Sequence, residues 1–420
     1  MKHLLTIIIA ILLLTACSKD DEKETPAVPA DRTVIVYIAG ENNLSSFIQG
    51  DLNEMKAGRQ QVTTNESLVV FVDKASSTEK PYIAKITDKG EMEHLYDYTE
   101  DFYASAPDKM EEVLRRCMAL CPASKDYGLV LWGHADGWIV EDSVDISVAA
   151  ARRAYGMDSG TNTPTDNRKY GKWINIPSMR KIFSALGIKW KFIFSDCCNM
   201  QNIETAYELK DAAEYLIGSP AEIPGIGAPY TTLVPAFFIH NDEQMYKSIC
   251  DRYYEQTDTR GGHLPISVIK TSQLDALAQA TRKVLPTVAA NVPKDDFGAG
   301  HIYYFGLVSQ DSWGDTAYLQ NEKNLYDMVD IIRWGLTDSP EAYEEWRNVF
   351  DQAVIYSRMS TFWHSNLVDL TKFKVTEQNF GGVSMFFPQT KHDNSLYYKH
   401  NELIKKTAWY YVVDWPSAGW

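Results

Sequence analysis

The feature that most constrains the fold is a series of short apolar segments with the composition of buried β-strands. Segments of helical periodicity separate several of them, and Gly, Ser or Asp follows half of them. Apolar strands that alternate with helices are typical of an α/β fold, in which helices cover a mostly parallel sheet on both faces. The predicted strands are residues 33–40, 67–72, 82–86, 127–132, 191–194, 213–217, 266–269 and 382–387.

The spacing of apolar residues between these strands predicts the helices. In the first of them, Met110, Val113, Leu114, Cys117 and Cys121 recur at helical spacing until Pro122 ends the run. The two cysteines are therefore predicted to be core thiols without chemistry. Further helices are predicted over residues 177–186, 244–254, 272–284, 325–334 and 340–358.

A long polar segment interrupts this pattern. Residues 141–172 are rich in Asp, Asn, Thr, Arg and Gly, which predicts a loop or an insertion between two strands. Its acids Asp142, Asp145 and Asp158 are scattered and are interpreted as solvated loop residues.

The N-terminus has the pattern of an export signal. Residues 1–16 combine a positive start with an apolar run that is shorter than the roughly 20 residues of a membrane-spanning helix. The run ends in Leu14-Thr15-Ala16-Cys17, which resembles a bacterial lipobox with Cys17 as the lipidated residue. The alternative is a plain signal peptide with an incidental cysteine. We expect an exported chain, lipid-anchored to the cell envelope and, in a bacterium with two membranes, to the outer one.

Residues 17–31 are predicted to be a tether. An acidic stretch is followed by Pro and Ala, a composition that stays solvated. The acidic start also resembles the surface-export signal of lipoproteins in Bacteroides-like bacteria, which would expose the protein at the cell surface.

The cysteine count and the net charge exclude several classes of protein. Beyond Cys17 there are five cysteines, an odd and sparse set that is neither a disulfide framework nor a zinc site (Cys117, Cys121, Cys197, Cys198 and Cys250). The net charge of −15 argues against a nucleic-acid partner, which requires a basic face.

Two predicted strands end in reactive side chains. His134 follows strand 127–132 after one glycine, and Cys198 follows strand 191–194. Because parallel strands of one sheet bring their carboxyl ends together, these side chains can form a nucleophile and its base. Taken singly, each residue has a more common structural interpretation, as a structural histidine or a core thiol.

The surrounding segments resemble two motifs of the clostripain (C11) family of cysteine peptidases, relatives of caspases, gingipains and legumains. Residues 129–138 (LVLWGHADGW) are similar to the family's histidine motif. Residues 192–200 (FIFSDCCNM) are similar to its Asp-Ala-Cys-Leu-Met nucleophile motif. Weaker similarities extend over most of the chain from about Arg32, at residues 122–127, Glu204, 219–230 and 381–388.

The resemblance implies a caspase-like α/β/α sandwich with a mostly parallel central sheet and a C-terminal α/β extension. The catalytic core would span residues 32–240 with an insertion at 141–172, and residues 241–420 would continue the peptidase fold. The implied reaction is hydrolysis of peptide bonds through a thioester acyl-enzyme. No obligatory cofactor is expected; calcium is conceivable from the family, but no EF-hand-like loop supports it.

The resemblance also implies a role for each motif residue. Cys198 would be the nucleophile, His134 the general base and acid, and the N–H groups of Cys198 and Ala135 the oxyanion donors. Asp196 would bind Arg or Lys at P1, the substrate residue before the scissile bond. In an extended strand Asp196 shares a side with Cys198, although a turn or N-cap acid is the alternative.

Three departures from the family pattern affect the site. Cys197 replaces the motif alanine, Ala135 replaces the usual glycine, and Asn199 and Gln201 replace apolar and small residues. Strand alternation is expected to turn Cys197 away from Cys198, and a vicinal disulfide is the alternative.

Self-cleavage and other functions remain open at the level of sequence. Some family members cut themselves after a basic residue between the two motifs, where this chain has Arg152 and Arg153; a solvated basic pair is the alternative. The partners expected are protein or peptide substrates and the membrane, and the oligomeric state is left open. The alternative functions are an inactive surface lipoprotein that binds peptide or glycan, and an amidase or transpeptidase that uses the same dyad.

Overall fold

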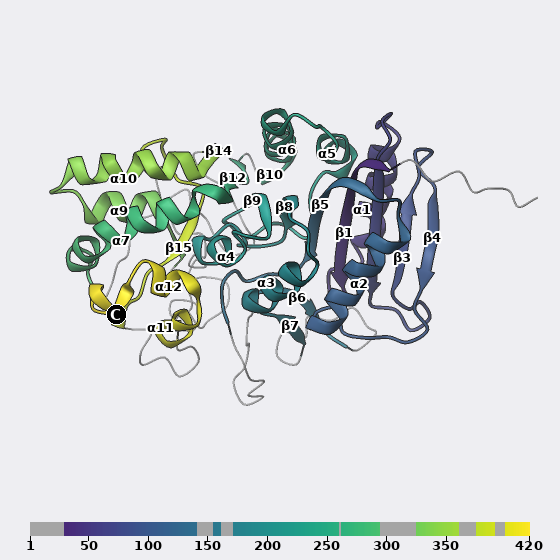
Figure 1. Cartoon of the computed structure of the whole chain (residues 1–420), viewed down its shortest axis with the longest axis horizontal. Helices are drawn as coiled ribbons and strands as arrows, with labels where there is room; N and C mark the ends of the chain where they lie inside the picture. The colour runs from purple at the N-terminus through teal and green to yellow at the C-terminus, as the bar shows by residue number, and fades with distance from the viewer. Residues whose placement is uncertain are drawn as a thin grey trace, which may run out of the picture.

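A nine-stranded sheet forms the centre of the part of the chain that the structure describes. The computed structural model describes residues 29–140, 154–160, 171–259, 262–294, 325–360, 375–390 and 400–420. The sheet order is β14-β12-β9-β8-β5-β1-β2-β3-β4 (Figure 1). Its strands are β1 (Ala30–Gly40), β2 (Ser67–Lys74), β3 (Tyr82–Ile86), β4 (Met92–Asp97), β5 (Ser124–Gly133), β8 (Trp190–Asp196), β9 (Ala213–Gly218), β12 (Ile266–Lys270) and β14 (Val354–Arg358).

The middle of the sheet is parallel and its two edges are antiparallel. Strands β2, β1, β5, β8 and β9 run in one direction, so that their carboxyl ends lie along one rim. Strands β3 and β4 at one edge, and β12 and β14 at the other, pair antiparallel. The parallel strands are buried on both faces, as their continuous apolar composition requires.

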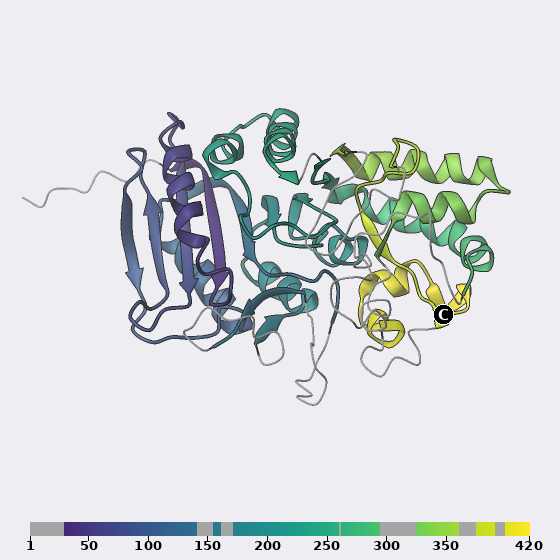
Figure 2. The ribbon, with the colours of Figure 1, turned by 180° about the vertical axis from the view of Figure 1, so that it is seen from behind.

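Helices cover both faces of the sheet. Alternate strand residues belong to opposite cores: Val36 packs in one core, and its neighbour Tyr37 in the other. The first core includes residues of α1 (Ile48–Arg59), α5 (Tyr230–Phe237) and α6 (Asp242–Gln256). The second includes residues of α2 (Pro107–Leu120), α3 (Ile176–Ala185) and α4 (Ile203–Glu208). The expected α/β/α sandwich is thus confirmed (Figures 1 and 2).

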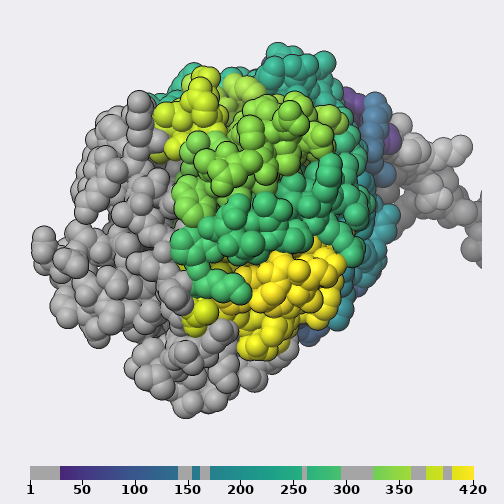
Figure 3. Space-filling view, turned by 90° about the vertical axis from the view of Figure 1, so that its left-hand side faces the viewer, coloured from purple at the N-terminus to yellow at the C-terminus, as the bar shows by residue number. Residues whose placement is uncertain are grey.

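The C-terminal residues form a helical layer at the β14 end of the molecule. Figure 3 shows its outer surface, with residues of α7, α9 and α10 beside the C-terminal segment. Its longer helices are α7 (Leu274–Asn291), α9 (Met328–Gly335) and α10 (Pro340–Ala353). Its short elements are η1 (Thr271–Gln273), β13 (Leu325–Asp327), β15 (Ser384–Phe386), α11 (His400–Leu403), η4 (Ile404–Lys406), α12 (Ala408–Val412) and η5 (Trp415–Ala418), and a separate hairpin pairs β10 (Asp258–Thr259) with β11 (Gly262–His263).

Strand β15 attaches this layer to the loop that follows β8. Ser384 N donates to Gln201 O at 3.0 Å, and Phe386 N donates to Glu204 Oε1 at 2.9 Å. Burial raises the pKa of Glu204 to about 8. The layer therefore supports, from behind, the segment that carries Cys198.

Several sequence predictions were wrong in detail. The helix predicted over 340–358 ends at Ala353, because the β-branched and aromatic run Val354-Ile355-Tyr356 pairs with β12 as strand β14. Residues 325–327, predicted as helix, form strand β13 instead. The edge strand β4 was not predicted, since its residues are largely polar or exposed.

The polar segment 141–172 is more ordered than a loop where the structure describes it. It contains β6 (Tyr155–Asp158) and the first residue of β7 (Lys172–Ile174), which pair antiparallel. Asp158, predicted to be solvated, is fully buried and accepts hydrogen bonds from Ala104 N at 2.7 Å and Gly160 N at 2.9 Å. Asp142 and Asp145 lie outside the described residues.

The predicted core thiols are confirmed. Cys117 and Cys121 are buried, and burial raises the pKa of both. Cys250 is also buried, and none of the five described cysteines forms a disulfide with another described cysteine. No helix in the described ranges is long and apolar enough to span a bilayer.

Candidate active site

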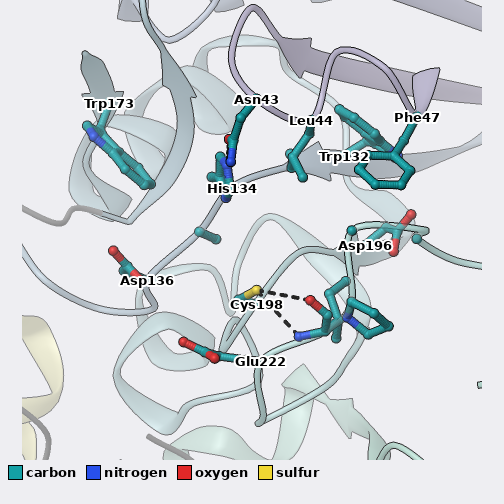
Figure 4. Close-up of a pocket in the computed structure, with 16 residues that line it drawn as sticks. Asn43, Leu44, Phe47, Trp132, His134, Asp136, Trp173, Asp196, Cys198 and Glu222 are labelled. Carbon is teal, nitrogen blue, oxygen red and sulfur yellow. Dashed lines mark hydrogen bonds between the residues drawn. The ribbon is translucent and has the colours of Figure 1, made fainter. Parts of the chain in front are cut away.

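The carboxyl ends of β5 and β8 bring His134 and Cys198 to one cavity. The two strands are parallel neighbours in which Trp132 lies opposite Asp196. His134 and Cys198 each follow two residues after this pair, and both are partly exposed. They line a cavity of about 360 Å³ together with Ala135 and Asp196 (Figure 4). The structure therefore places the four predicted site residues at one site.

Local backbone geometry explains why both side chains turn into the cavity. Gly133 has a φ of 145°, and a Cβ there would lie 2.8 Å from Ala39 O, so the turn into His134 requires glycine. After Cys198, Asn199 adopts a φ of 58°, a left-handed conformation that asparagine tolerates better than most residues. Asn199 N donates to Ala221 O at 3.0 Å, which fixes the turn.

Asn43 orients the imidazole of His134. Its Oδ1 lies 2.7 Å from His134 Nε2, and an amide oxygen can only accept, so Nε2 carries the proton of this bond. The backbone is held as well, because Gly156 N of β6 donates to His134 O at 2.8 Å. In Figure 4 the Asn43 side chain lies beside the ring.

The thiol of Cys198 contacts the backbone of Ile223. Ile223 N donates to Sγ at 3.4 Å, and Sγ donates to Ile223 O at 3.7 Å (Figure 4). The first of these bonds persists when the sulfur is a thiolate, so it favours ionisation.

Cys197 points in the opposite direction, as strand alternation predicts. Its Sγ donates to Leu131 O at 3.0 Å within the core, and burial raises its pKa well above the usual range. A buried thiol of this kind is a poor nucleophile.

Ala135 forms an isolated antiparallel bridge with Tyr155. The flanking bonds are Asp136 N to Ala154 O at 3.1 Å and Gly156 N to His134 O at 2.8 Å. In such a pair the two bridged residues exchange no hydrogen bonds, so the N–H of Ala135 points away from β6.

Asp196 is buried at one end of the cavity. Its Oδ2 accepts from Tyr230 Oη at 2.7 Å and from Ala228 N at 3.1 Å. Its Oδ1 has no hydrogen-bond partner among the described residues. Burial raises its pKa to about 6, while the two donors lower it.

Asp51 of α1 is a second buried carboxylate beside Asp196. Its Oδ2 accepts from Trp132 Nε1 at 2.6 Å. A Cβ at Gly227 would lie 3.2 Å from Oδ2 of both aspartates, so the two carboxylates flank the same glycine. Burial, followed by the charge of Asp196, raises the pKa of Asp51 to about 8. We call Asp51 and Asp196 the pocket pair.

The cavity wall is acidic. Among the described residues that line it, Asp136, Asp196 and Glu222 carry carboxylates, and none is a lysine or arginine. Such a wall suits a cationic group and disfavours an anionic one.

Sequence reasoning missed the residues that other segments bring to this site: Asn43, Asp51, Trp132, Glu222, Ile223 and Gly227. Asn43 and Asp51 follow a predicted strand, which is a weak local signal. The others lie within or next to segments quoted for their resemblance, but nothing in the sequence indicated their contacts. Cys17, Arg152 and Arg153 lie outside the described residues.

Comparison with known proteins identifies relatives over nearly the whole chain. A sequence model of the clostripain family matches residues 36–420. A secreted C11 cysteine protease of Bacteroides thetaiotaomicron, solved with an irreversible peptide inhibitor, is 29% identical with a TM-score of 0.72. The match covers 92% of this chain and 100% of that one.

A second structure shares the fold. An inactive zymogen C11 protease of Parabacteroides distasonis is 24% identical with a TM-score of 0.70, covering 92% of this chain and 99% of that one. A search of curated proteins gave no match.

Proposed function

Because this chain belongs to the clostripain family of cysteine peptidases, we propose that it cleaves peptide bonds after Arg or Lys with Cys198 and His134 as its catalytic dyad. The observation that carries the proposal is the shared cavity, which Cys198, His134 and Asp196 line at the ends of β5 and β8, with Asp51 of α1 behind Asp196.

The dyad proceeds through an acyl-enzyme. His134 takes the proton of Cys198 Sγ, and the thiolate forms a C–S bond with the scissile carbonyl carbon. Since His134 Nε2 is hydrogen-bonded to Asn43 Oδ1, Nδ1 is the nitrogen that exchanges this proton with Cys198 Sγ. The C–N bond then breaks as His134 protonates the leaving amine, and water hydrolyses the thioester.

The oxyanion donors are the N–H groups of Ala135 and Cys198. The bridge to Tyr155 supports this role for Ala135, because it directs the N–H away from β6. A donor of this type contributes on the order of 3 kcal/mol to transition-state stabilisation.

The pocket pair binds the P1 side chain. Asp196 lies two residues before the nucleophile, and its unpartnered Oδ1 is an acceptor for a charge-assisted hydrogen bond from Arg or Lys. Asp51 adds a second carboxylate behind it, and none of the described residues that line the cavity is a lysine or an arginine.

A panel of fluorogenic peptides that differ only at P1 tests this proposal. We expect wild type to prefer Arg and Lys, Cys198→Ala to be inactive, and Asp196→Ala to lose the preference. Activity that survives Cys198→Ala would overturn the mechanism, and a P1 preference that survives Asp196→Ala would overturn the pocket assignment alone.

Labelling separates this function from an inactive binding protein. A thiol-reactive peptide with Arg at P1 should modify wild type at Cys198 and leave Cys198→Ala unmodified. Folded wild-type protein that takes no label would favour the binding function. Turnover of a non-peptide amide in preference to every peptide would instead favour an amidase or transpeptidase.

Self-cleavage after Arg152 or Arg153 is a further part of the proposal. Ala154, the next residue, is buried and its carbonyl accepts from Asp136 N, close to the dyad. We expect wild type to separate into two fragments on a denaturing gel and Cys198→Ala to stay intact. N-terminal sequencing of the second fragment identifies the bond, and one intact wild-type band would contradict the proposal.

Export with a lipid anchor on Cys17 completes the proposal. The lipobox-like segment supports it, and the 29%-identical relative is described as secreted. Incorporation of a labelled fatty acid should be lost in Cys17→Ala, with Cys117→Ala as the matched control. Equal labelling of both variants would refute the anchor.

A further inference from the structure

Two further carboxylates lie beside the dyad, on the side away from Asp196. Asp136 and Glu222 line the cavity of about 360 Å³ that Cys198 and His134 share. In Figure 4 they lie on one side of the Cys198 sulfur, and Asp196 lies on the other. The proposed mechanism uses neither of them. We call Asp136 and Glu222 the second acid pair.

Glu222 is the residue that indicates a ligand. It is only 9% exposed, yet its side chain lines the cavity. Within the described part of the chain, its carboxylate accepts no hydrogen bond and forms no ion pair. A largely buried carboxylate without a donor is stabilised by a cationic partner. The space in front of it is the cavity that the substrate enters.

The backbone on both sides of Glu222 is bonded to the nucleophile and the turn after it. Ala221 O accepts from Asn199 N at 3.0 Å, and Ile223 N donates to Cys198 Sγ at 3.4 Å. The backbone of Glu222 therefore keeps a set position relative to the sulfur, as a residue that selects substrates requires.

Asp136 is held in a similar way relative to the imidazole. It follows His134 by two residues, and its N–H donates to Ala154 O at 3.1 Å. The next residue, Gly137, lies close to the nucleophile turn, since a Cβ there would be 3.1 Å from Asn199 O. The second acid pair thus consists of two carboxylates on firmly held backbone, one beside each member of the dyad.

The geometry of peptide-bond cleavage decides which substrate residue reaches this pair. The scissile carbonyl carbon bonds to Cys198 Sγ, and the P1 side chain on its acyl side extends towards Asp196. The leaving nitrogen is bonded to the other side of that carbon, next to His134, which protonates it. The residue that carries this nitrogen is P1′, the first residue after the scissile bond. It therefore extends past the dyad towards Asp136 and Glu222.

We propose that the second acid pair forms a subsite for a basic residue at P1′, so that the enzyme favours bonds between two basic residues. The inference rests on the proposed function, because it requires P1 to bind at Asp196. A cationic P1′ side chain would meet two carboxylates and, among the described lining residues, no lysine or arginine.

Trp173 of β7 favours Arg over Lys at this subsite. It lines the cavity on the same side of Cys198 as Asp136 (Figure 4). A guanidinium stacks on an aromatic ring and bonds a carboxylate through two N–H groups, whereas an ammonium is a compact, strongly hydrated charge.

Internally quenched peptides that keep Arg at P1 and differ only at P1′ test the proposal. We expect kcat/KM of wild type to be about tenfold higher with Arg at P1′ than with Ala, and lower with Asp than with Ala. In Glu222→Gln and in Asp136→Asn, the Arg-to-Ala ratio should fall to about twofold or less. Glu222→Lys should make Asp at P1′ better than Arg. Glu255→Gln removes an exposed carboxylate on α6 and should keep the wild-type ratio.

The ratio compares two substrates on one enzyme, so a variant that only lowers the amount of folded enzyme does not move it. A wild-type ratio near one, with Arg at P1 still preferred, overturns the proposal and leaves the proposed function intact. A wild-type ratio retained by either Glu222→Gln or Asp136→Asn overturns it as well.

The P1 preference of Glu222→Gln, measured at constant P1′, completes the test. Loss of that preference would place Glu222 in the P1 pocket and overturn the proposal. If wild type cleaves no peptide with Arg at P1, the proposed function fails, and this inference fails with it.

Discussion

The molecule has two sets of buried carboxylates that differ in what surrounds them. One is the pocket pair; the other is Glu41, Asp73 and Asp158 at the carboxyl ends of β1, β2 and β6, which we call the strand-end group. Asp196 opens on a cavity of about 360 Å³, with Asp51 directly behind it. Glu41, Asp73 and Asp158 are buried and interact with one another, and they are not among the residues that line this cavity. Burial raises carboxyl pKa values in both places. We therefore expect the pocket pair, and not the strand-end group, to bind a substrate side chain, because Asp196 opens on the cavity.

The pocket pair and the strand-end group also differ in the hydrogen-bond donors that contact them. The pocket pair is held by the neutral donors of Trp132, Tyr230 and Ala228, which leave its charge available to a ligand. In the strand-end group, Asp158 accepts two backbone N–H bonds, whereas neither carboxylate oxygen of Asp73 has a hydrogen-bond partner among the described residues. Burial and the neighbouring acids therefore favour the protonated forms of Asp73 and Asp158.

The largest effect should come from Asp196→Asn, which removes the charge facing the cavity. We expect kcat/KM for a substrate with Arg at P1 to fall roughly 100-fold, since a charge-assisted bond to a desolvated cation is lost. A substrate with norleucine at P1 should change less than about twofold, because it makes no such bond. Equal losses on both substrates would mean that Asp196 is structural.

Asp51→Asn should have a smaller effect that depends on pH. With pKa values of about 8 for Asp51 and about 6 for Asp196, the pocket becomes more negative as pH rises. The wild-type inhibition constant of agmatine, a small guanidinium compound, should therefore fall between pH 6 and 8. We expect this fall to flatten in Asp51→Asn, with about tenfold weaker binding at pH 8. Asn53→Ala, at an exposed position of the same helix, is the control. An unchanged pH profile of agmatine inhibition in Asp51→Asn would show that Asp51 is not part of the P1 pocket.

Gly227→Ala probes the space that the pocket pair shares. Its φ of 73° strains an alanine by roughly 1–2 kcal/mol, and the new Cβ would lie 3.2 Å from both aspartates. We expect KM for Arg substrates to rise about fivefold with kcat nearly unchanged. Gly187→Ala has a similar φ of 72° with open space around it, and it separates backbone strain from crowding. If both variants behave alike, the pocket pair does not share this space.

The smallest effect concerns the pH dependence of stability. A carboxyl whose pKa is raised by folding binds more protons in the native state, so stability falls as pH rises from about 4 towards 8. Asp73→Asn removes the unpartnered carboxyl and should flatten this fall. We expect it to unfold about 2–4 °C higher than wild type at pH 8, a gain of roughly 1 kcal/mol. Thermal unfolding at pH 5 and 8 measures the slope, and a variant less stable at both pH values would contradict the repulsion.

The sequence predicts the sheet centre and the four motif residues because their signals are local. Strand runs such as 33–40 are apolar throughout, and His134 and Cys198 sit directly after two of them. The strand Val354–Arg358 was misassigned because it continues the sequence of a helix and owes its conformation to pairing with β12. Asp51 was missed, and Asp158 was interpreted as a solvated loop residue, because only tertiary contacts bury these two side chains.

The register of β5 against β8 has a consequence for how this protein can evolve. Trp132 lies opposite Asp196. His134 follows two residues after Trp132, and Cys198 follows two residues after Asp196. Because side chains alternate along a strand, a single-residue insertion in either step would send one reactive group towards the opposite layer. Insertions and deletions can therefore change the length of the segment that joins β5 to β8. The spacing from Trp132 to His134 and from Asp196 to Cys198 must stay at two residues.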